Sequence, residues 1–180
     1  MFTLTTTYQR NYKGSVTWGV GCDFQLEVLP FFVGIGKIRY TGKTMVTETG
    51  YREIEHTADW ELEVWAPNLS SLLETAARGM YALAQMQLVD GERESREFEI
   101  PFGDRESLLV DFLAELLYLG EGEGLVMDEF SFTFDGNTLK VRAWGAPIKN
   151  QSKEIKAVTY HRLQIRETEF GLVVNLVFDV

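Results

Sequence analysis

The sequence is poor in the residues that build disulfides and zinc sites. Its 180 residues include one cysteine, Cys22, and two histidines, His56 and His161. A single cysteine cannot form an intramolecular disulfide, and the Cys and His ligands of a structural zinc site are too few. These absences favour a protein of a reducing compartment.

Positive charge and long apolar runs are also scarce. Lys and Arg number 17 against 27 Asp and Glu, so the net charge is −10, and such a surface repels the phosphates of nucleic acids. The longest strongly apolar stretch near the start, 28–36, is shorter than the roughly 20 residues needed to cross a bilayer. It also lies too far along the chain for an ordinary signal peptide. We therefore expect a cytoplasmic protein with no direct nucleic-acid binding and no membrane association.

The charge is divided unevenly between the start and the rest of the chain. Residues 1–44 carry five basic and two acidic residues, a net +3, which leaves −13 for residues 45–180. Apolar periodicity is clear only from about residue 51 onward. Residues 1–44 are either a small β-rich addition or a segment upstream of a true start at Met45, and we favour the second interpretation. The predicted domain is 45–180.

Two segments have the apolar spacing of helices. Asn68 is a suitable N-cap for an amphipathic helix over 69–87, directly after Pro67. Asp104 can cap a second, leucine-rich helix that the glycines at positions 120, 122 and 124 would end. The aliphatic stripes of both helices are interpreted as core.

The remaining periodic segments predict strands. Apolar and acidic residues alternate from Trp60 to Val64, and a short strand is expected over 97–101. Phenylalanines at 130, 132 and 134 mark a strand that a tight turn at 135–137 reverses. Further strands are expected at about 157–166 and 171–179. The order β-α-β-α-β-β-β-β predicts a single α+β domain with two amphipathic helices packed on a largely antiparallel sheet.

Two features do not fit a purely structural interpretation. The segment Glu55-His-Thr-Ala-Asp59 places a histidine and a carboxylate three residues apart before a strand. The apolar run 172–178 is closed by Asp179 and Val180, and charges at the end of a buried strand need a partner. A hard cation such as Ca²⁺ or Mg²⁺ is one candidate, since these ions prefer oxygen ligands. Simple hydration of both carboxylates is the other.

Nucleophilic catalysis has no support in the sequence. Neither Cys22 nor any serine has the local pattern of an activated nucleophile, such as a Gly-x-Ser-x-Gly elbow. We interpret His161 as a structural residue on a strand and His56 as a cap or brace for the turn at Asp59. Hydrolase chemistry through a side-chain nucleophile therefore has no positive support in the sequence.

Several segments in order resemble the archease family. They are the Glu55–Asp59 motif, the helix from Leu69 to Ala84, the second helix from Leu108 to Tyr118, the segment Glu154-Ile-Lys-Ala-Val-Thr-Tyr-His161 and the ending Val177-Phe-Asp-Val180. The resemblance runs from about Tyr51 to the last residue. Residues 1–44 have no counterpart in it.

The resemblance implies a non-enzymatic protein cofactor of an RtcB-type RNA ligase, the enzyme that joins RNA ends in tRNA splicing and RNA repair. Archeases promote guanylylation of that ligase by GTP and so permit multiple turnovers. The family binds a divalent cation, often calcium. By resemblance the metal ligands here are Asp59, Asp179 and the main-chain oxygen of Val180.

Two other functions remain open at this point. A chaperone or specificity factor for a tRNA-modifying enzyme, such as a tRNA methyltransferase, would need neither GTP nor metal. A small metal-dependent hydrolase using Asp59 and Asp179 would turn over a substrate without any ligase present.

Overall fold

The computed structural model describes residues 49–54 and 60–180, which form nine strands and two helices. The order along the chain is β1 (Gly50–Ile54), β2 (Trp60–Ala66), α1 (Leu69–Leu83), β3 (Gln87–Leu88), β4 (Glu94–Pro101), α2 (Arg105–Glu123), β5 (Leu125–Asp135), β6 (Thr138–Asn150), β7 (Ala157–Thr159), β8 (Arg166–Thr168) and β9 (Gly171–Asp179).

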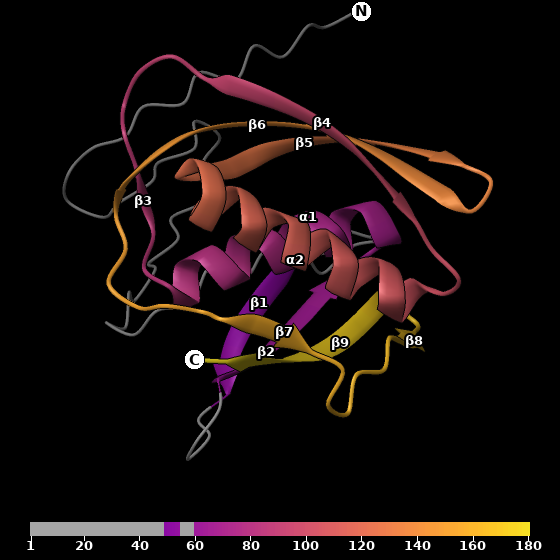
Figure 1. Cartoon of the computed structure of the whole chain (residues 1–180). Coiled ribbons are helices and arrows are strands. Elements are labelled where there is room, and N and C mark those ends of the chain that lie inside the picture. Colours follow the sequence, from indigo (N-terminus) through magenta and orange to yellow (C-terminus); the bar gives the residue numbers. More distant parts are fainter. Residues whose placement is uncertain (1–48, 55–59) are drawn as a thin grey trace, which may run out of the picture. The chain divides into compact units, whose positions relative to one another are not determined.

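The strands form two antiparallel sheets. One has the order β1-β2-β9-β7, with β8 also paired to β9, and the other joins β3, β4 and β5 to the long strand β6. Both helices lie between the sheets and contact strands of each (Figure 1). The predicted α+β class, with two helices on antiparallel strands, is confirmed. The predicted order lacks β1, β3 and β8.

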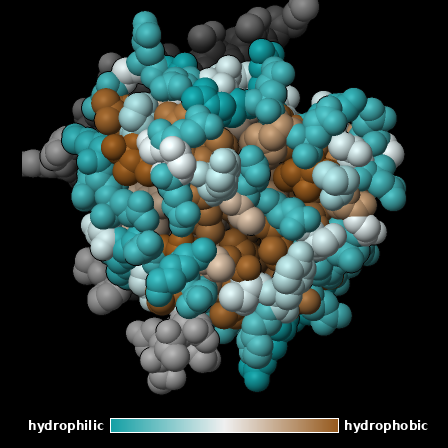
Figure 2. Space-filling view, in the orientation of Figure 1, coloured by the Kyte–Doolittle hydropathy of each residue, from teal (hydrophilic) through white to brown (hydrophobic). Residues whose placement is uncertain are grey.

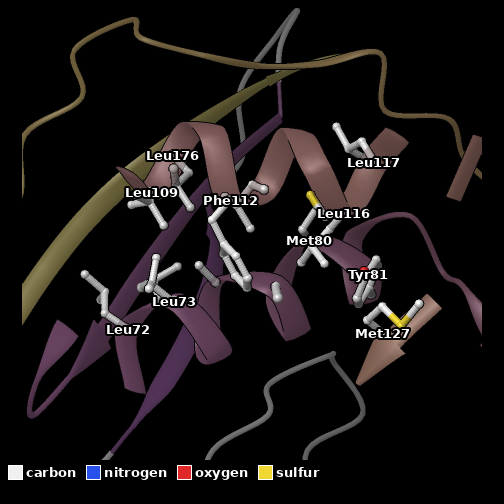
Figure 3. Close-up of a cluster of buried hydrophobic side chains, with 14 of the residues drawn as sticks. Leu72, Leu73, Met80, Tyr81, Leu109, Phe112, Leu116, Leu117, Met127 and Leu176 are labelled. Carbon is white, nitrogen blue, oxygen red and sulfur yellow. The ribbon is translucent and has the colours of Figure 1, made fainter. Parts of the chain in front are cut away.

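The core lies where α2 meets both sheets and α1. Phe112 of α2 is fully buried, and its ring makes edge-on contacts with Phe130 and Phe132 of β5 at 5.5 Å between centroids. Figure 3 shows α1 and α2 contributing Leu73, Met80 and Leu116 to the same cluster. Helix α2 buries side chains on more than one face, because sheets flank it on both sides.

Both predicted helix starts are confirmed. The Asn68 side chain accepts a hydrogen bond from the Ser71 amide at 2.9 Å, and Asp104 accepts one from the Ser107 amide at 2.7 Å. The Ser107 hydroxyl lies 3.4 Å from the Asp104 amide, which completes a capping box. Capping satisfies amide groups that have no partner within the first helical turn.

The end of α1 differs from the prediction, whereas the glycine cluster ends α2 as predicted. Helix α1 ends at Leu83 rather than 87, because Gln85 has φ 52° and Gln87 already belongs to β3. Helix α2 continues through Gly120 and Gly122, and only Gly124, in the left-handed conformation with φ 68°, ends it. Glycine suits that position because residues that have a Cβ atom rarely adopt the left-handed conformation.

The predicted strand over 157–166 is wrong. The chain forms β7, then a turn at Tyr160–Arg162 in which Arg162 has φ 54°, and later β8. His161 lies exposed in this turn, where its amide donates to the Thr159 hydroxyl at 3.3 Å. It is therefore not a strand residue.

Candidate functional site

Strand β9 carries Asp179 and Val180 to one end of its sheet. It lies between β2 and β7, and Leu172, Val174, Leu176 and Phe178 are buried along one face. Asp179 is exposed and its main-chain oxygen accepts a hydrogen bond from the Lys156 amide at 2.9 Å. The backbone at Asp179 is thus fixed by pairing while its carboxylate faces solvent.

The Lys156 ammonium lies at the same end. Its Nζ donates to the main-chain oxygen of Val180 at 2.8 Å. This is the oxygen that the family resemblance names as a metal ligand, and in the structure it already faces a positive charge. Lys156 lies in the segment Glu154–His161 of the family resemblance, but nothing in the sequence pattern predicts its contact with Val180.

Trp60 and Lys153 complete this end of the molecule. Trp60, the first described residue of β2, is paired with Phe178, and the Lys153 ammonium lies 4.5 Å from the centroid of its ring. We call Trp60, Lys153, Lys156, Asp179 and Val180 the β9 tip.

Asp59 and His56 lie outside the described residues. The chain position of Asp59 is next to Trp60, and Phe178, the partner of Trp60, is next to Asp179. Of the predicted ligands Asp59, Asp179 and Val180, the structure therefore describes Asp179 and Val180. These two lie together at the tip.

The oxygen donors of the tip suit a hard cation. A carboxylate and a main-chain oxygen are ligand types that Ca²⁺ and Mg²⁺ prefer. The Val180 oxygen already accepts a hydrogen bond from a positively charged group, the Lys156 ammonium. Within residues 49–54 and 60–180, no group of three or more His, Cys, Asp or Glu side chains is arranged to hold a metal. Any site at the tip thus needs a ligand beyond Asp179 and Val180.

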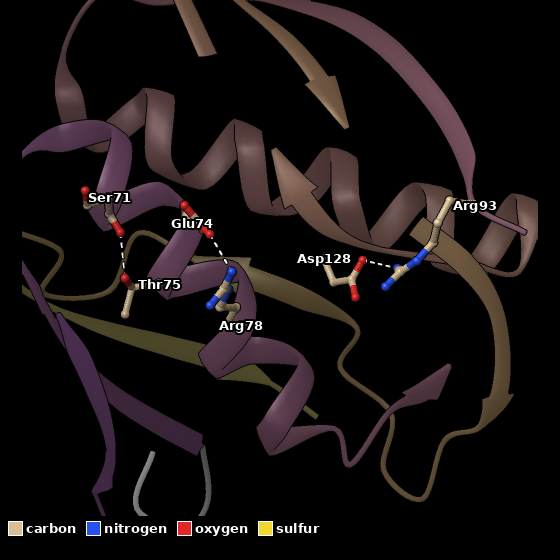
Figure 4. A network of polar contacts seen from close by, with 6 residues as sticks. All are labelled: Ser71, Glu74, Thr75, Arg78, Arg93 and Asp128. Atoms are coloured by element: carbon tan, nitrogen blue, oxygen red, sulfur yellow. Dashed lines mark hydrogen bonds and ion pairs between the residues drawn. The ribbon is translucent and has the colours of Figure 1, made fainter. Parts of the chain in front are cut away.

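The cations of the tip differ from most others in the part of the chain that the structure describes. Arg93 pairs with Asp128 and Arg78 with Glu74 (Figure 4), and Arg142, Arg96 and Lys140 also pair with carboxylates. Lys153 and Lys156 form no ion pair with a carboxylate side chain of the described residues. Their ammonium groups contact the Trp60 ring and the Val180 oxygen instead.

A cavity of about 350 Å³ is lined in part by Lys153 and Glu154, which begin the segment that leads to Lys156. Leu117 and Gly120 of α2, Met86, and the chain from Gln151 to Ile155 form its walls. Glu121 and Glu154 are the acidic residues of its lining.

No helix within the described ranges is long and apolar enough to cross a membrane.

The chain is similar to known archeases in sequence. The model of the Archease protein family matches residues 51–180. The archease of Pyrococcus abyssi is 34% identical over 130 residues, which cover 67% of this chain and 91% of that protein. The archease of Methanosarcina mazei is 35% identical over 140 residues, covering 72% and 95%.

Two solved structures have the same fold. One is an archease from Thermotoga maritima, described as a possible chaperone, with 28% identity, a TM-score of 0.54 and coverage of 72% of this chain and 96% of that one. The other, protein 1598 of Methanobacterium thermoautotrophicum, has 20% identity, a TM-score of 0.56 and coverage of 72% and 98%, and it supports the fold alone. With the family model matched over most of the chain, this protein belongs to the archease family.

Proposed function

We propose that this protein is a non-enzymatic cofactor that activates an RtcB-type RNA ligase by promoting its guanylylation, and that it does so with a divalent cation held at the β9 tip. The observation that carries the proposal is the paired backbone end that presents the Asp179 carboxylate beside the Val180 oxygen and the Lys156 ammonium. Such a rigid end can enter the active site of another protein.

The proposed ligands are Asp59, Asp179 and the main-chain oxygen of Val180, and the cation is Ca²⁺ or Mg²⁺. Asp59 directly precedes Trp60 in the chain, and Trp60 is paired with Phe178, the neighbour of Asp179. This adjacency supports the proposed third ligand. When bound, the cation would supply positive charge beside the phosphates of GTP.

The residues of the tip have roles in this proposal. Asp59, Asp179 and Val180 hold and orient the ion, and Lys156 places a second positive charge beside them. In guanylylation a nucleophile of the ligase forms a bond to the α-phosphorus and pyrophosphate leaves. Phosphoryl transfer depends mainly on positioning and charge neutralisation, which is what the tip offers.

The charge of the protein supports an encounter with such a ligase. Residues 45–180 carry −13, whereas a cleft that binds RNA and GTP is rich in positive charge. Opposite charges speed association and make it depend on salt. Activation is thus expected to need more of this protein as the salt concentration rises.

A guanylylation assay with the ligase of the same organism tests the proposal. Wild-type protein in substoichiometric amounts should raise ligase turnover, and Asp179→Asn or Asp59→Asn should abolish the stimulation. Asp90→Asn makes the same charge change at an exposed residue in a turn and should stimulate like wild type. Stimulation that survives both Asp59→Asn and Asp179→Asn rejects the metal-dependent mechanism.

A second candidate function is that of a chaperone or specificity factor for a tRNA-modifying enzyme. The Thermotoga maritima relative is described as a possible chaperone, and Tyr118 and Phe170 here are 65% and 74% exposed. In that case the protein should reduce aggregation of a tRNA methyltransferase without GTP or metal. The same Asp179→Asn variant should then be fully active.

A further inference from the structure

The solvent-facing side of α2 carries acidic residues and a tyrosine at helical spacing. Asp111, Glu115, Tyr118 and Glu121 follow one another at intervals of three or four residues and so lie on one side of the helix. Tyr118 is 65% exposed. We call these four residues, with Glu154 beside the end of the helix, the α2 face.

The carboxylates of the α2 face form no ion pair within residues 49–54 and 60–180, although other carboxylates of this part pair with arginine or lysine. Lys153, the basic residue in the lining of the adjoining cavity, directs its ammonium to the Trp60 ring. Near the start of α2, the pKa of Tyr160 is raised by burial and by the charges of Asp111 and Asp104. The face therefore has an uncompensated negative charge.

The cavity described above lies at the Glu121 end of the α2 face. Leu117 and Ile155 in its lining are almost fully buried, and Glu121 and Glu154 supply carboxylates. Figure 2 shows apolar surface exposed between polar residues on this side of the molecule. An arginine or lysine side chain, with an aliphatic stem and a cationic head, matches apolar walls with carboxylates beside them.

The cavity and the β9 tip share one segment of chain. Lys153 lines the cavity and stacks on Trp60, and Lys156, three residues later, contacts Val180. A partner that fills the cavity therefore lies directly beside the tip. The two sites can contact one partner at the same time.

We propose that the α2 face is the docking surface for the ligase, and that an arginine or lysine on a basic segment of the ligase enters the cavity between Glu121 and Glu154. The proposal rests on the proposed function for the identity of the partner. Tyrosine and arginine are enriched among the residues that dominate the energy of protein interfaces, and Tyr118 lies one helical turn from Glu121. Docking at this face positions the tip at the active site of the ligase.

Two double variants with equal charge changes test the docking surface. Glu121→Lys with Glu154→Lys reverses the charge at the cavity, and Glu99→Lys with Glu129→Lys reverses the charge of two exposed residues on β4 and β5. Binding of each full-length variant to the ligase is measured by titration calorimetry at fixed salt. The first variant should raise Kd at least about tenfold, and the second by no more than roughly twofold to threefold, since a remote charge acts only on the encounter.

The outcomes separate the docking proposal from the proposed function. If both double variants lose affinity equally while wild type still activates the ligase, the charge acts only through long-range attraction and the docking surface is wrong. If wild type neither binds nor activates the ligase, the proposed function fails and the docking surface with it. Maximal stimulation at saturating concentration should remain with Glu121→Lys/Glu154→Lys and be lost with Asp179→Asn. Circular dichroism and melting temperature establish that each variant is folded.

Discussion

The sheet of β4, β5 and β6 and the β9 tip differ in what their charged groups contact. On the sheet, Arg142 pairs with Glu97 and Lys140 with Asp135. At the tip, the ammonium groups of Lys153 and Lys156 contact an aromatic ring and a main-chain oxygen. Charges on the sheet are paired with charges of opposite sign, whereas the ammonium groups at the tip contact no carboxylate side chain of the described residues. Changes on the sheet side should therefore alter stability and changes at the tip should alter activation.

The largest effect on stability is expected from Phe112→Ala, where α2 packs on β5. Phe112 is fully buried against Phe130 and Phe132, so its truncation leaves a cavity and should lower the free energy of unfolding by about 3–5 kcal/mol. Urea denaturation at 25 °C measures the change. Phe112→Leu keeps most of the volume and should cost much less. A loss as small as that of the leucine variant would show that the core refills the space.

A smaller loss is expected from Gly145→Ala on β6. A Cβ there would lie 1.9 Å from the carbonyl oxygen of Val126 on β5, beside the bulge between Met127 and Glu129. The strands must separate, and the free energy of unfolding should fall by about 2–3 kcal/mol. Gly103→Ala is the matched control because a Cβ there has open space. Equal stability of the two variants would mean that the β5–β6 pairing adapts freely.

At the tip, Lys156→Met should change stability little and ion binding more. The lysine is exposed, so its removal should alter the free energy of unfolding by less than about 1 kcal/mol. Loss of a positive charge a few ångströms from the Val180 oxygen should strengthen Ca²⁺ binding by roughly tenfold to thirtyfold, since two unit charges about 4 Å apart repel by about 1 kcal/mol in water and Ca²⁺ carries two charges. Calorimetric titration with Ca²⁺ measures this. Lys149→Met, which removes a lysine outside the tip, should leave the affinity for Ca²⁺ unchanged. Equal changes in Ca²⁺ affinity for the two lysine variants would contradict the role of Lys156.

The parts of this fold that the sequence predicted are those set by local chemistry. Asn68 and Asp104 cap helices because their side chains reach amides three residues later, and Leu62 and Val64 lie on the buried face of a strand because side chains alternate. The division into two sheets could not be predicted, because it depends on which distant strands pair. The role of Lys156 was missed for the same reason, since only the β7–β9 pairing brings it to Val180. The place of Asp59 stays a prediction.

The smallest effect concerns Asp104, a carboxylate whose partners are local. Hydrogen bonds from the Ser107 amide and hydroxyl hold the pKa of Asp104 below its ordinary value. A carboxylate with a lowered pKa in the folded state stabilises the protein above its unfolded pKa of about 4, and this contribution is lost as the pH falls through the folded pKa. Asp104→Asn keeps a cap oxygen but cannot titrate. The stability difference between wild type and Asp104→Asn should therefore shrink below about pH 4, measured as urea midpoints from pH 6 to pH 2. A difference that stays constant over this range would mean that the ionised form has no advantage in the cap. Activation of the ligase at neutral pH should be equal for both proteins, because Asp104 lies in the cap of α2 and not at the β9 tip.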